Sequence, residues 1–196
     1  DTCSEADRAE TTGDVHEAGW IPVDAANVTL GGEIGRRIEN TIRNNLLALD
    51  PDRDFLDPFR AKDRTSGYIG LGKLIDATVR FARYTGDPDV LKLKNYLVSE
   101  TLAIQEEDGY IGMFEPESRM WSLWDIHEMA YITYGLATDY TFYGQSSSLD
   151  AAVRAAEYIQ ERWDTMPDGW GSDHVAPHVA VTGLERAMLA LYKHTG

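Results

Sequence analysis

The chain has 196 residues, of which 43% are hydrophobic, and its 33 acidic and 18 basic side chains give a formal charge of −15. That charge repels phosphate backbones and anionic membrane surfaces, so we expect neither nucleic acid nor a membrane as a partner. No apolar run approaches the roughly 18 residues that a membrane span needs. Because Cys3 is the single cysteine, these residues can form neither an internal disulfide nor a Cys-based zinc finger.

The N-terminal part, residues 1–29, is predicted to be a polar arm followed by an extended lead-in. Residues 1–20 lack hydrophobic periodicity, and "IPVDAANVTLGG" at 21–32 places β-branched residues between chain breakers, which favours a short strand. A first helix is then predicted from Glu33 to the Asp50-Pro51 pair. It carries an apolar residue at every fourth position: Ile34, Ile38, Ile42 and Leu46.

Five further helices follow, each marked by an apolar stripe and by residues that start or end it. The second runs from Leu71 to the turn at Gly86, and the third begins at Asp87-Pro88 and ends near Ile104. The fourth is predicted to begin at Ser122, with Asp125 as its capping-box partner, and to end near residues 142–144. Ser147 and Asp150 repeat that spacing for a fifth helix ending near Trp163, and a sixth places Val181, Leu184, Met188 and Leu191 on one face.

Two kinds of turn alternate along these helices. Turns ending in glycine close helices at 84–86, 142–144 and 194–196, and Asp-Gly-aromatic turns stand at 108–110 and 168–170. Since consecutive helices run antiparallel, the two kinds belong on opposite ends of a ring or solenoid of helical hairpins. The second end then receives the long connections, 54–68, 108–122 and 164–177, in which function usually resides.

The candidate functional residues lie in or beside these long connections. Aromatic faces beside carboxylates and imidazoles suit the C–H faces and hydroxyl groups of sugars, which predicts an oligo- or polysaccharide ligand. Asp125 and Glu128, three positions apart, are weak candidates for acid/base catalysis, although a capping role explains Asp125 equally well. The substrate-binding candidates are Trp124, Asp125, His127, Tyr110, Trp170, His174 and His178.

Two motif-like stretches carry less weight. His174 and His178 are four apart, but Pro177 interrupts a helix there and no zinc motif surrounds them, so we predict no metal site within the chain. "GYIGLGK" at 67–73 lacks the spacing of a phosphate-binding loop. We therefore expect no cofactor in this segment.

Three longer phrases are similar to a known family. "LGKLIDATVRFARYTGDPDVLKLKNYLVSETLAIQEEDGYIG", "LWDIHEMAYITYGLATDYTFYG" and "GLERAMLALYKHTG" resemble the N-terminal half of the catalytic domain of glycoside hydrolase family 127, the β-L-arabinofuranosidase-like proteins. The resemblance covers about residues 30–196. It implies an all-α, six-hairpin (α/α)6 toroid, of which 30–196 would form the first three hairpins, and a retaining hydrolase of furanosidic bonds.

The resemblance also implies where the reaction is carried out. The family's proposed cysteine nucleophile, acidic partner and zinc-binding cysteines belong to the second half of the toroid, so zinc is expected in a full-length enzyme and this segment would supply the substrate-binding half of the cleft. This chain departs from its relatives at two places that the resemblance assigns to substrate contacts. Tyr131 stands where relatives carry a histidine. Where relatives carry "GHQE", this chain reads "VTGLE" at 181–185 and keeps only the glutamate, Glu185. His127, His174 and His178 are the candidates to replace those histidines.

Other functions fit part of the same pattern. A non-catalytic glycan-binding or scaffolding helical repeat is one, and another toroid enzyme, such as a polysaccharide lyase or a sugar epimerase, is a second. The chain starts with Asp and shows no basic-then-apolar leader, and acidic enzymes of this kind are often exported. We therefore expect a secreted or periplasmic protein.

Overall fold

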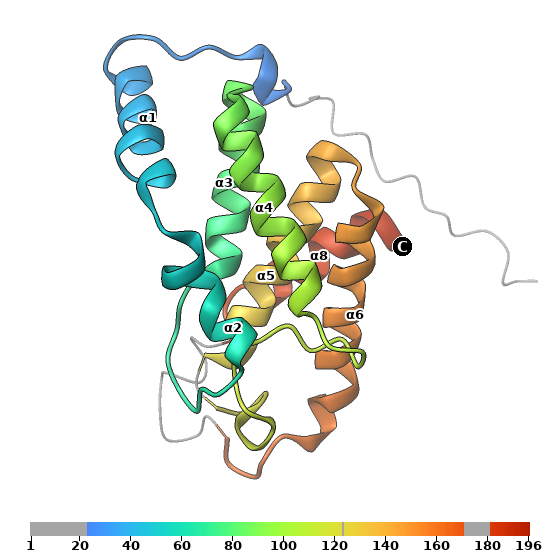
Figure 1. The fold of residues 1–196 in the computed structure, drawn as a ribbon. Coiled ribbons are helices and arrows are strands. Elements are labelled where there is room, and N and C mark those ends of the chain that lie inside the picture. Colours follow the sequence, from blue (N-terminus) through green and yellow to red (C-terminus); the bar gives the residue numbers. More distant parts are fainter. Residues whose placement is uncertain (1–22, 123, 171–180) are drawn as a thin grey trace, which may run out of the picture.

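The computed structural model describes residues 23–122, 124–170 and 181–196, and it confirms an all-α fold of helical hairpins (Figure 1). Within these residues no helix combines the length and the hydropathy that a membrane crossing requires. The α-helices, in chain order, are α1 (Gly32–Asn44), α2 (Asp57–Ala61), α3 (Leu71–Thr85), α4 (Pro88–Ile104), α5 (Asp125–Tyr143), α6 (Ser146–Arg162) and α8 (Leu184–Thr195).

The helices from α3 onward form two layers. Helices α3, α5 and α8 lie side by side, and α4 and α6 pack against one face of them, nearer the viewer in Figure 1, so α5 contacts α3, α6 and α8. Helices α3, α5 and α8 run in the same direction. The start of α8 at Gly183 meets Tyr131 in the second turn of α5, and His194 near its end stacks edge-on against Tyr140.

The helix ends that the sequence marks most clearly are confirmed. Gly86 and Gly144 follow α3 and α5 in the left-handed conformation, with φ of 62° and 67°, which glycine adopts without steric cost. Asp87 caps α4 by accepting hydrogen bonds from the amides of Asp89 and Val90. Each of these signals depends on residues within one turn of the helix end.

The N-terminal part differs from the prediction. The arm at 1–20 lies outside the described residues, and in place of a strand the lead-in forms a 3-10 turn at Ala25–Asn27, because the Asp24 carboxylate accepts the Ala26 amide. Helix α1 ends at Asn44, before the predicted limit. Its apolar stripe packs at one end only: Ile42 is buried against α3 and α4, whereas Ile34 is 62% exposed.

The predicted connection at 54–68 is largely helical. A π-helical segment, Asp52–Leu56, continues into α2, and both are held to the core by Leu56 and Phe59, which are fully buried. The true connection is therefore the shorter stretch 62–70. Sequence periodicity missed these helices because each has five residues, too few to show a repeating apolar stripe.

Three predicted helix starts are also wrong. Helix α5 begins at Asp125, three residues after Ser122, because the Asp125 carboxylate binds the Met120 amide in place of a capping box. Helix α6 begins at Ser146 with no side-chain cap. Val181 was expected in the last predicted helix, but it precedes that helix, α8, which begins at Leu184.

The predicted placement of the two Asp-Gly bends at one end of the fold is confirmed. Arg162, the last residue of α6, donates a hydrogen bond to Asp108 (2.9 Å), beside the bend at Gly109. Trp170, which follows Gly169, packs against Trp121 of the earlier connection, with ring centroids 5.3 Å apart. Both bends lie at the lower end of the view in Figure 1.

Helices α3 and α5 approach one another closely at Gly72. A Cβ at this position would stand 2.1 Å from the Ile132 nitrogen and 2.1 Å from the Tyr131 carbonyl carbon, both in the backbone of α5. Such a distance is far inside van der Waals contact, so no side chain fits there. On the other helix, Gly135 faces the Gly72 carbonyl in the same way.

A buried ion pair joins α4, α5 and α6. The Lys94 ammonium, 2% exposed, donates to Asp139 (2.9 Å), and the hydroxyl of buried Ser148 donates to the other Asp139 oxygen (2.6 Å). The Lys94 nitrogen also lies 4.2 Å from the centre of the Tyr143 ring. Each charge therefore has a specific partner, without which its burial would be costly.

Replacing Gly72 by alanine should lower the free energy of unfolding by more than about 2 kcal/mol, because α3 and α5 must separate to admit the methyl group. Gly31→Ala is the control, since a Cβ there meets no atom within 4 Å, and it should cost less than about 1 kcal/mol. Chemical denaturation measures both. Equal effects of the two substitutions would show that the close approach at Gly72 does not matter.

Lys94→Met should cost about 3 kcal/mol or more of unfolding free energy, because it leaves the Asp139 carboxylate buried without its cation. The double variant Lys94→Met/Asp139→Asn should recover most of that loss, since the amide is neutral and still accepts from Ser148. Arg36→Met, at a 64% exposed ion pair, should change stability by less than about 0.5 kcal/mol. A double variant as unstable as the single one would contradict the charge argument.

Candidate functional site

The candidate site lies where the long connections meet the first turns of α3 and α5. The connections 62–70 and 105–122 are tied together by an isolated parallel β-bridge between Arg64 and Phe114. The Arg64 amide donates to the Met113 carbonyl (3.3 Å), and the Glu115 amide donates to the Arg64 carbonyl (2.9 Å). The chain that leads into α3 is thereby held against the chain that leads into α5.

Glu128, in the first turn of α5, is fully buried and accepts hydrogen bonds from the N-terminal end of α3. Its Oε1 atom accepts from the amides of Ile69 (2.6 Å) and Gly70 (2.5 Å). Its Oε2 atom has no hydrogen-bond partner among the described residues. Burial raises the pKa of Glu128 to about 7, although the backbone amides of Gly70, Ile69 and Leu71 act in the opposite direction.

Asp125 is also fully buried, and it holds the connection that precedes α5. Its carboxylate accepts from the Met120 amide (2.7 Å) and from the hydroxyl of Tyr110 (2.9 Å), whose oxygen in turn accepts the Phe114 amide (2.8 Å). Burial raises the pKa of Asp125 to about 6. Both Asp125 and Tyr110 are 0% exposed, and their hydrogen bonds hold this loop in place.

Trp124 stands immediately before α5 in a strained backbone conformation. Its φ is 80°, in the left-handed region that large side chains rarely adopt, and its carbonyl accepts the Glu128 amide (2.9 Å). Strain of this kind persists where the surroundings fix the backbone, and it is concentrated at functional sites. Here it turns the Trp124 side chain toward Tyr68 and His127.

Four rings meet beside Glu128 and form what we call the aromatic cluster: Tyr68, Trp124, His127 and Tyr131. His127 is at its centre, with its ring centroid 5.1 Å from that of Tyr68, 5.4 Å from that of Trp124 and 4.8 Å from that of Tyr131. Tyr68 is 37% exposed, whereas His127 is 6% exposed. Burial, followed by the negative charge of Glu128, raises the pKa of the Tyr68 hydroxyl.

Lys73, in the first turn of α3, adds a cation to the aromatic cluster. Its ammonium lies 3.3 Å from Nε2 of His127, 4.3 Å from the centre of the Tyr131 ring and 4.9 Å from that of Tyr68. Lys73 is solvent exposed. The cluster thus combines apolar ring faces with hydrogen-bond donors that a hydroxylated ligand can use.

A second group of aromatic side chains consists of Trp121, Trp163 and Trp170. The Trp121 ring packs edge-on against both of the others, at 5.8 Å and 5.3 Å between centroids. The Trp170 indole donates to the Trp121 carbonyl (2.8 Å), and the Trp121 indole donates to the Thr165 hydroxyl (3.1 Å). These contacts connect the loop after α6 to the loop before α5.

The structure brings some of the predicted site residues together and separates others. Trp124, His127 and Glu128 lie together, whereas Tyr110 and Asp125 form the neighbouring buried pair and Trp170 belongs to the tryptophan group. His174 and His178 lie outside the described residues. Sequence reasoning did not single out Lys73 or the place of Tyr131 in the cluster, although Tyr131 follows His127 by four positions, one helical turn.

The family resemblance implies zinc in a full-length enzyme, and a zinc site needs several His, Cys, Asp or Glu side chains close together. Across 23–122, 124–170 and 181–196, no three His, Cys, Asp or Glu side chains come close enough to hold a metal ion. Structural zinc sites take four such ligands, and catalytic sites take three. The described residues therefore do not fit a zinc centre.

Comparison with known proteins agrees with the phrases noted in the sequence. Residues 28–196, which include all the helices described above, match the protein family described as beta-L-arabinofuranosidase, GH127 catalytic domain. A comparison with curated proteins and another with solved structures each gave no match. The family match covers most of the 196 residues, and the chain belongs to the family of GH127 β-L-arabinofuranosidase catalytic domains.

Proposed function

We propose that this chain forms the substrate-binding part of a glycoside hydrolase that cleaves β-L-arabinofuranosidic bonds. Family membership supports glycoside hydrolysis in general. The observation that carries the more specific proposal is the aromatic cluster with Lys73, held at the N-terminal ends of α3 and α5 by Glu128. Ring faces supply stacking area for a sugar, and the polar groups beside them fix its orientation.

Each residue of the cluster has a proposed role. Trp124 and Tyr68 stack on the C–H face of the sugar, and Lys73 and His127 form hydrogen bonds with its hydroxyl groups. Tyr131, at the position where the family resemblance places a histidine, adds a hydroxyl to the same surface. His174, His178 and Trp170 keep their predicted role as further contacts to the glycan.

We assign Asp125 and Glu128 to positioning and not to direct contact with the glycosidic bond. Both carboxyls are 0% exposed and bound by backbone amides, which suits groups that hold a loop and a helix start in place. The nucleophile and its acidic partner would then come from residues other than those described. In this proposal the segment 30–196 remains the first three hairpins of an (α/α)6 catalytic domain.

A non-catalytic glycan-binding function is the second candidate. It is favoured by the burial of both candidate carboxyls. The two functions differ in a simple observable. A hydrolase releases the aglycone from an aryl β-L-arabinofuranoside, whereas a binding module retains the intact glycoside.

In the full protein, Trp124→Gly should raise the KM for an aryl β-L-arabinofuranoside about tenfold, because loss of one stacking face is worth about 1.4 kcal/mol. Glycine accepts the positive φ at this position, so the melting temperature should not fall. The matched control is Trp163→Ala, which removes a 38% exposed indole from the tryptophan group and should leave KM unchanged. Calorimetric binding without any release of aglycone by the wild type would instead favour the binding module.

Glu128→Gln should flatten the dependence of stability on pH. Because the folded-state pKa of Glu128 is raised from 4.5 to about 7, the folded protein keeps a proton that the unfolded chain releases within this window. The stability gained from this bound proton is complete below about pH 4.5 and is lost as pH rises through 7. Between pH 5 and pH 8, the free energy of unfolding of the wild type should fall by on the order of 2 kcal/mol more than that of the variant.

The control for this pH series is Glu117→Gln, which changes an exposed carboxylate in the connection before α5. Asp125 titrates in the wild type and in both variants, so the difference between pH profiles reports the Glu128 carboxyl together with its interaction with Asp125. Urea denaturation at each pH provides the unfolding free energies. Parallel profiles for the wild type and Glu128→Gln would refute the assignment of a buried, proton-holding carboxyl.

A further inference from the structure

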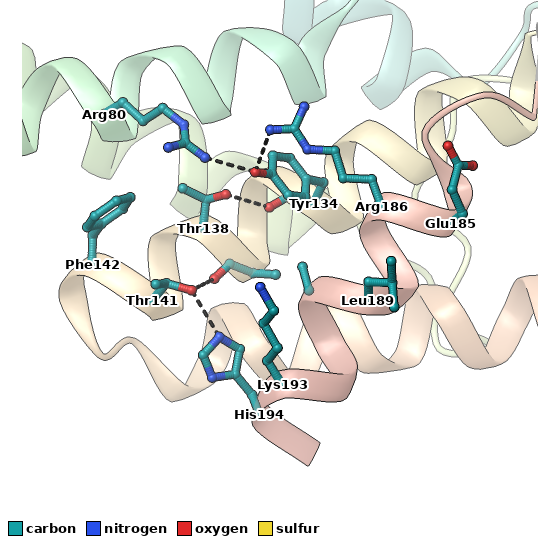
Figure 2. A pocket seen from close by; sticks show the side chains of 12 residues that line it. Arg80, Tyr134, Thr138, Thr141, Phe142, Glu185, Arg186, Leu189, Lys193 and His194 are labelled. Carbon is teal, nitrogen blue, oxygen red and sulfur yellow. Dashed lines mark hydrogen bonds between the residues drawn. The ribbon is translucent and has the colours of Figure 1, made fainter. Parts of the chain in front are cut away.

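A second surface of the molecule carries a concentration of positive charge that the proposed sugar contacts do not use. A groove of about 680 Å³ lies between α8 and the adjoining faces of α3 and α5 (Figure 2). Its lining includes the apolar side chains of Ala137, Phe142, Leu189 and Ala190. Its cationic side chains come from two helices, Arg80 from α3, and Arg186 and Lys193 from α8.

Two of these cations converge on a single oxygen atom. The Nη2 atoms of Arg80 and Arg186 donate to the hydroxyl oxygen of Tyr134, at 2.9 Å and 2.8 Å (Figure 2). The Arg186 guanidinium also lies 4.2 Å from the centre of the Tyr134 ring. A phenol that accepts two N–H bonds has its own hydrogen left to donate, and among the described residues that hydrogen has no acceptor.

The positive charges around the groove are only partly balanced by nearby carboxylates. Arg80 pairs with Asp76 through Nε (2.9 Å), whereas Arg186 and Lys193 have no carboxylate within salt-bridge distance in the described parts of the chain. Glu185 also lines the groove, but its carboxylate accepts the Gly183 amide at 3.2 Å, and Figure 2 shows it at the far end from Tyr134. In a chain with a formal charge of −15, this surface attracts anions.

We propose that the groove binds a small carboxylate ligand, with the carboxylate beside Arg80, Arg186 and the Tyr134 hydroxyl. Guanidinium groups match the planar geometry of a carboxylate, and the phenol hydrogen supplies one more donor. The remainder of the ligand lies on Phe142, whose ring centre is 5.7 Å from the Arg80 guanidinium, a surface suited to the ring of an acidic sugar or the carbon chain of an organic acid. This binding does not depend on the glycosidase activity proposed above.

Isothermal titration calorimetry of the full protein tests the proposal with D-glucuronate, and D-glucose serves as the neutral ligand with the same ring. Glucuronate should bind and glucose should not, and added NaCl should weaken the binding because the groove is open to solvent. Succinate separates the two sources of the carboxylate: its binding indicates organic acids in general, and its failure alongside glucuronate binding indicates acidic sugars. Equal binding of glucose and glucuronate, or binding of neither glucuronate nor succinate, would overturn the proposal.

Two variants locate the site. Arg80→Gln/Arg186→Gln should weaken glucuronate binding at least tenfold, and Tyr134→Phe, which removes one hydroxyl, should weaken it several-fold with the fold unchanged. The matched control is Arg36→Gln/Arg37→Gln, which removes two charges from the exposed face of α1 and should leave the affinity as it is. Inorganic phosphate binding as tightly as glucuronate would show a general anion site and contradict the carboxylate assignment, as would equal losses in the two double variants.

Discussion

The close approach of α3 to α5 at Gly72 is the constraint on which the candidate site depends. With no side chain at position 72, the first turn of α3 lies directly on the α5 backbone at Tyr131 and Ile132. Glu128, one turn earlier in α5, then reaches the two amides that precede α3. Greater separation would leave a buried carboxylate and the unpaired amides of a helix start without each other, and each is costly to bury alone.

The sequence predicted those parts of the fold that local signals determine. Asp87 before Pro88 and the glycine after α3 fixed the ends of two helices, because a cap contacts amides or carbonyls within four residues. The start of α5 was misplaced for the converse reason. The spacing of Ser122 and Asp125 suits a capping box, but Asp125 binds Tyr110, fifteen positions earlier, and no local pattern reveals such a contact.

The same distinction applies to the candidate site. Trp124, His127 and Glu128 were identified together because they are neighbours on one helix, where spacing predicts proximity. Lys73 comes from α3 and reaches His127 only because the two helices touch, which is a property of the packed fold. A single sequence shows the period of each helix but not which faces meet, so the cation could not be assigned to the rings in advance.

Three carboxyl side chains are buried on α5 because this helix is enclosed by other helices on several sides. It packs against α3, α6 and α8, so charged residues on several of its faces are enclosed. Asp139 is matched by the Lys94 cation and the Ser148 hydroxyl. Asp125 is matched by the Met120 amide and the Tyr110 hydroxyl, and Glu128 by the amides of Ile69 and Gly70. Amides stabilise a carboxylate without neutralising it, and the pKa values of these two groups rise with burial. The start of α5 therefore carries two carboxyls with raised pKa values, whereas the cations Lys73, Arg80, Arg186 and Lys193 stand exposed on α3 and α8.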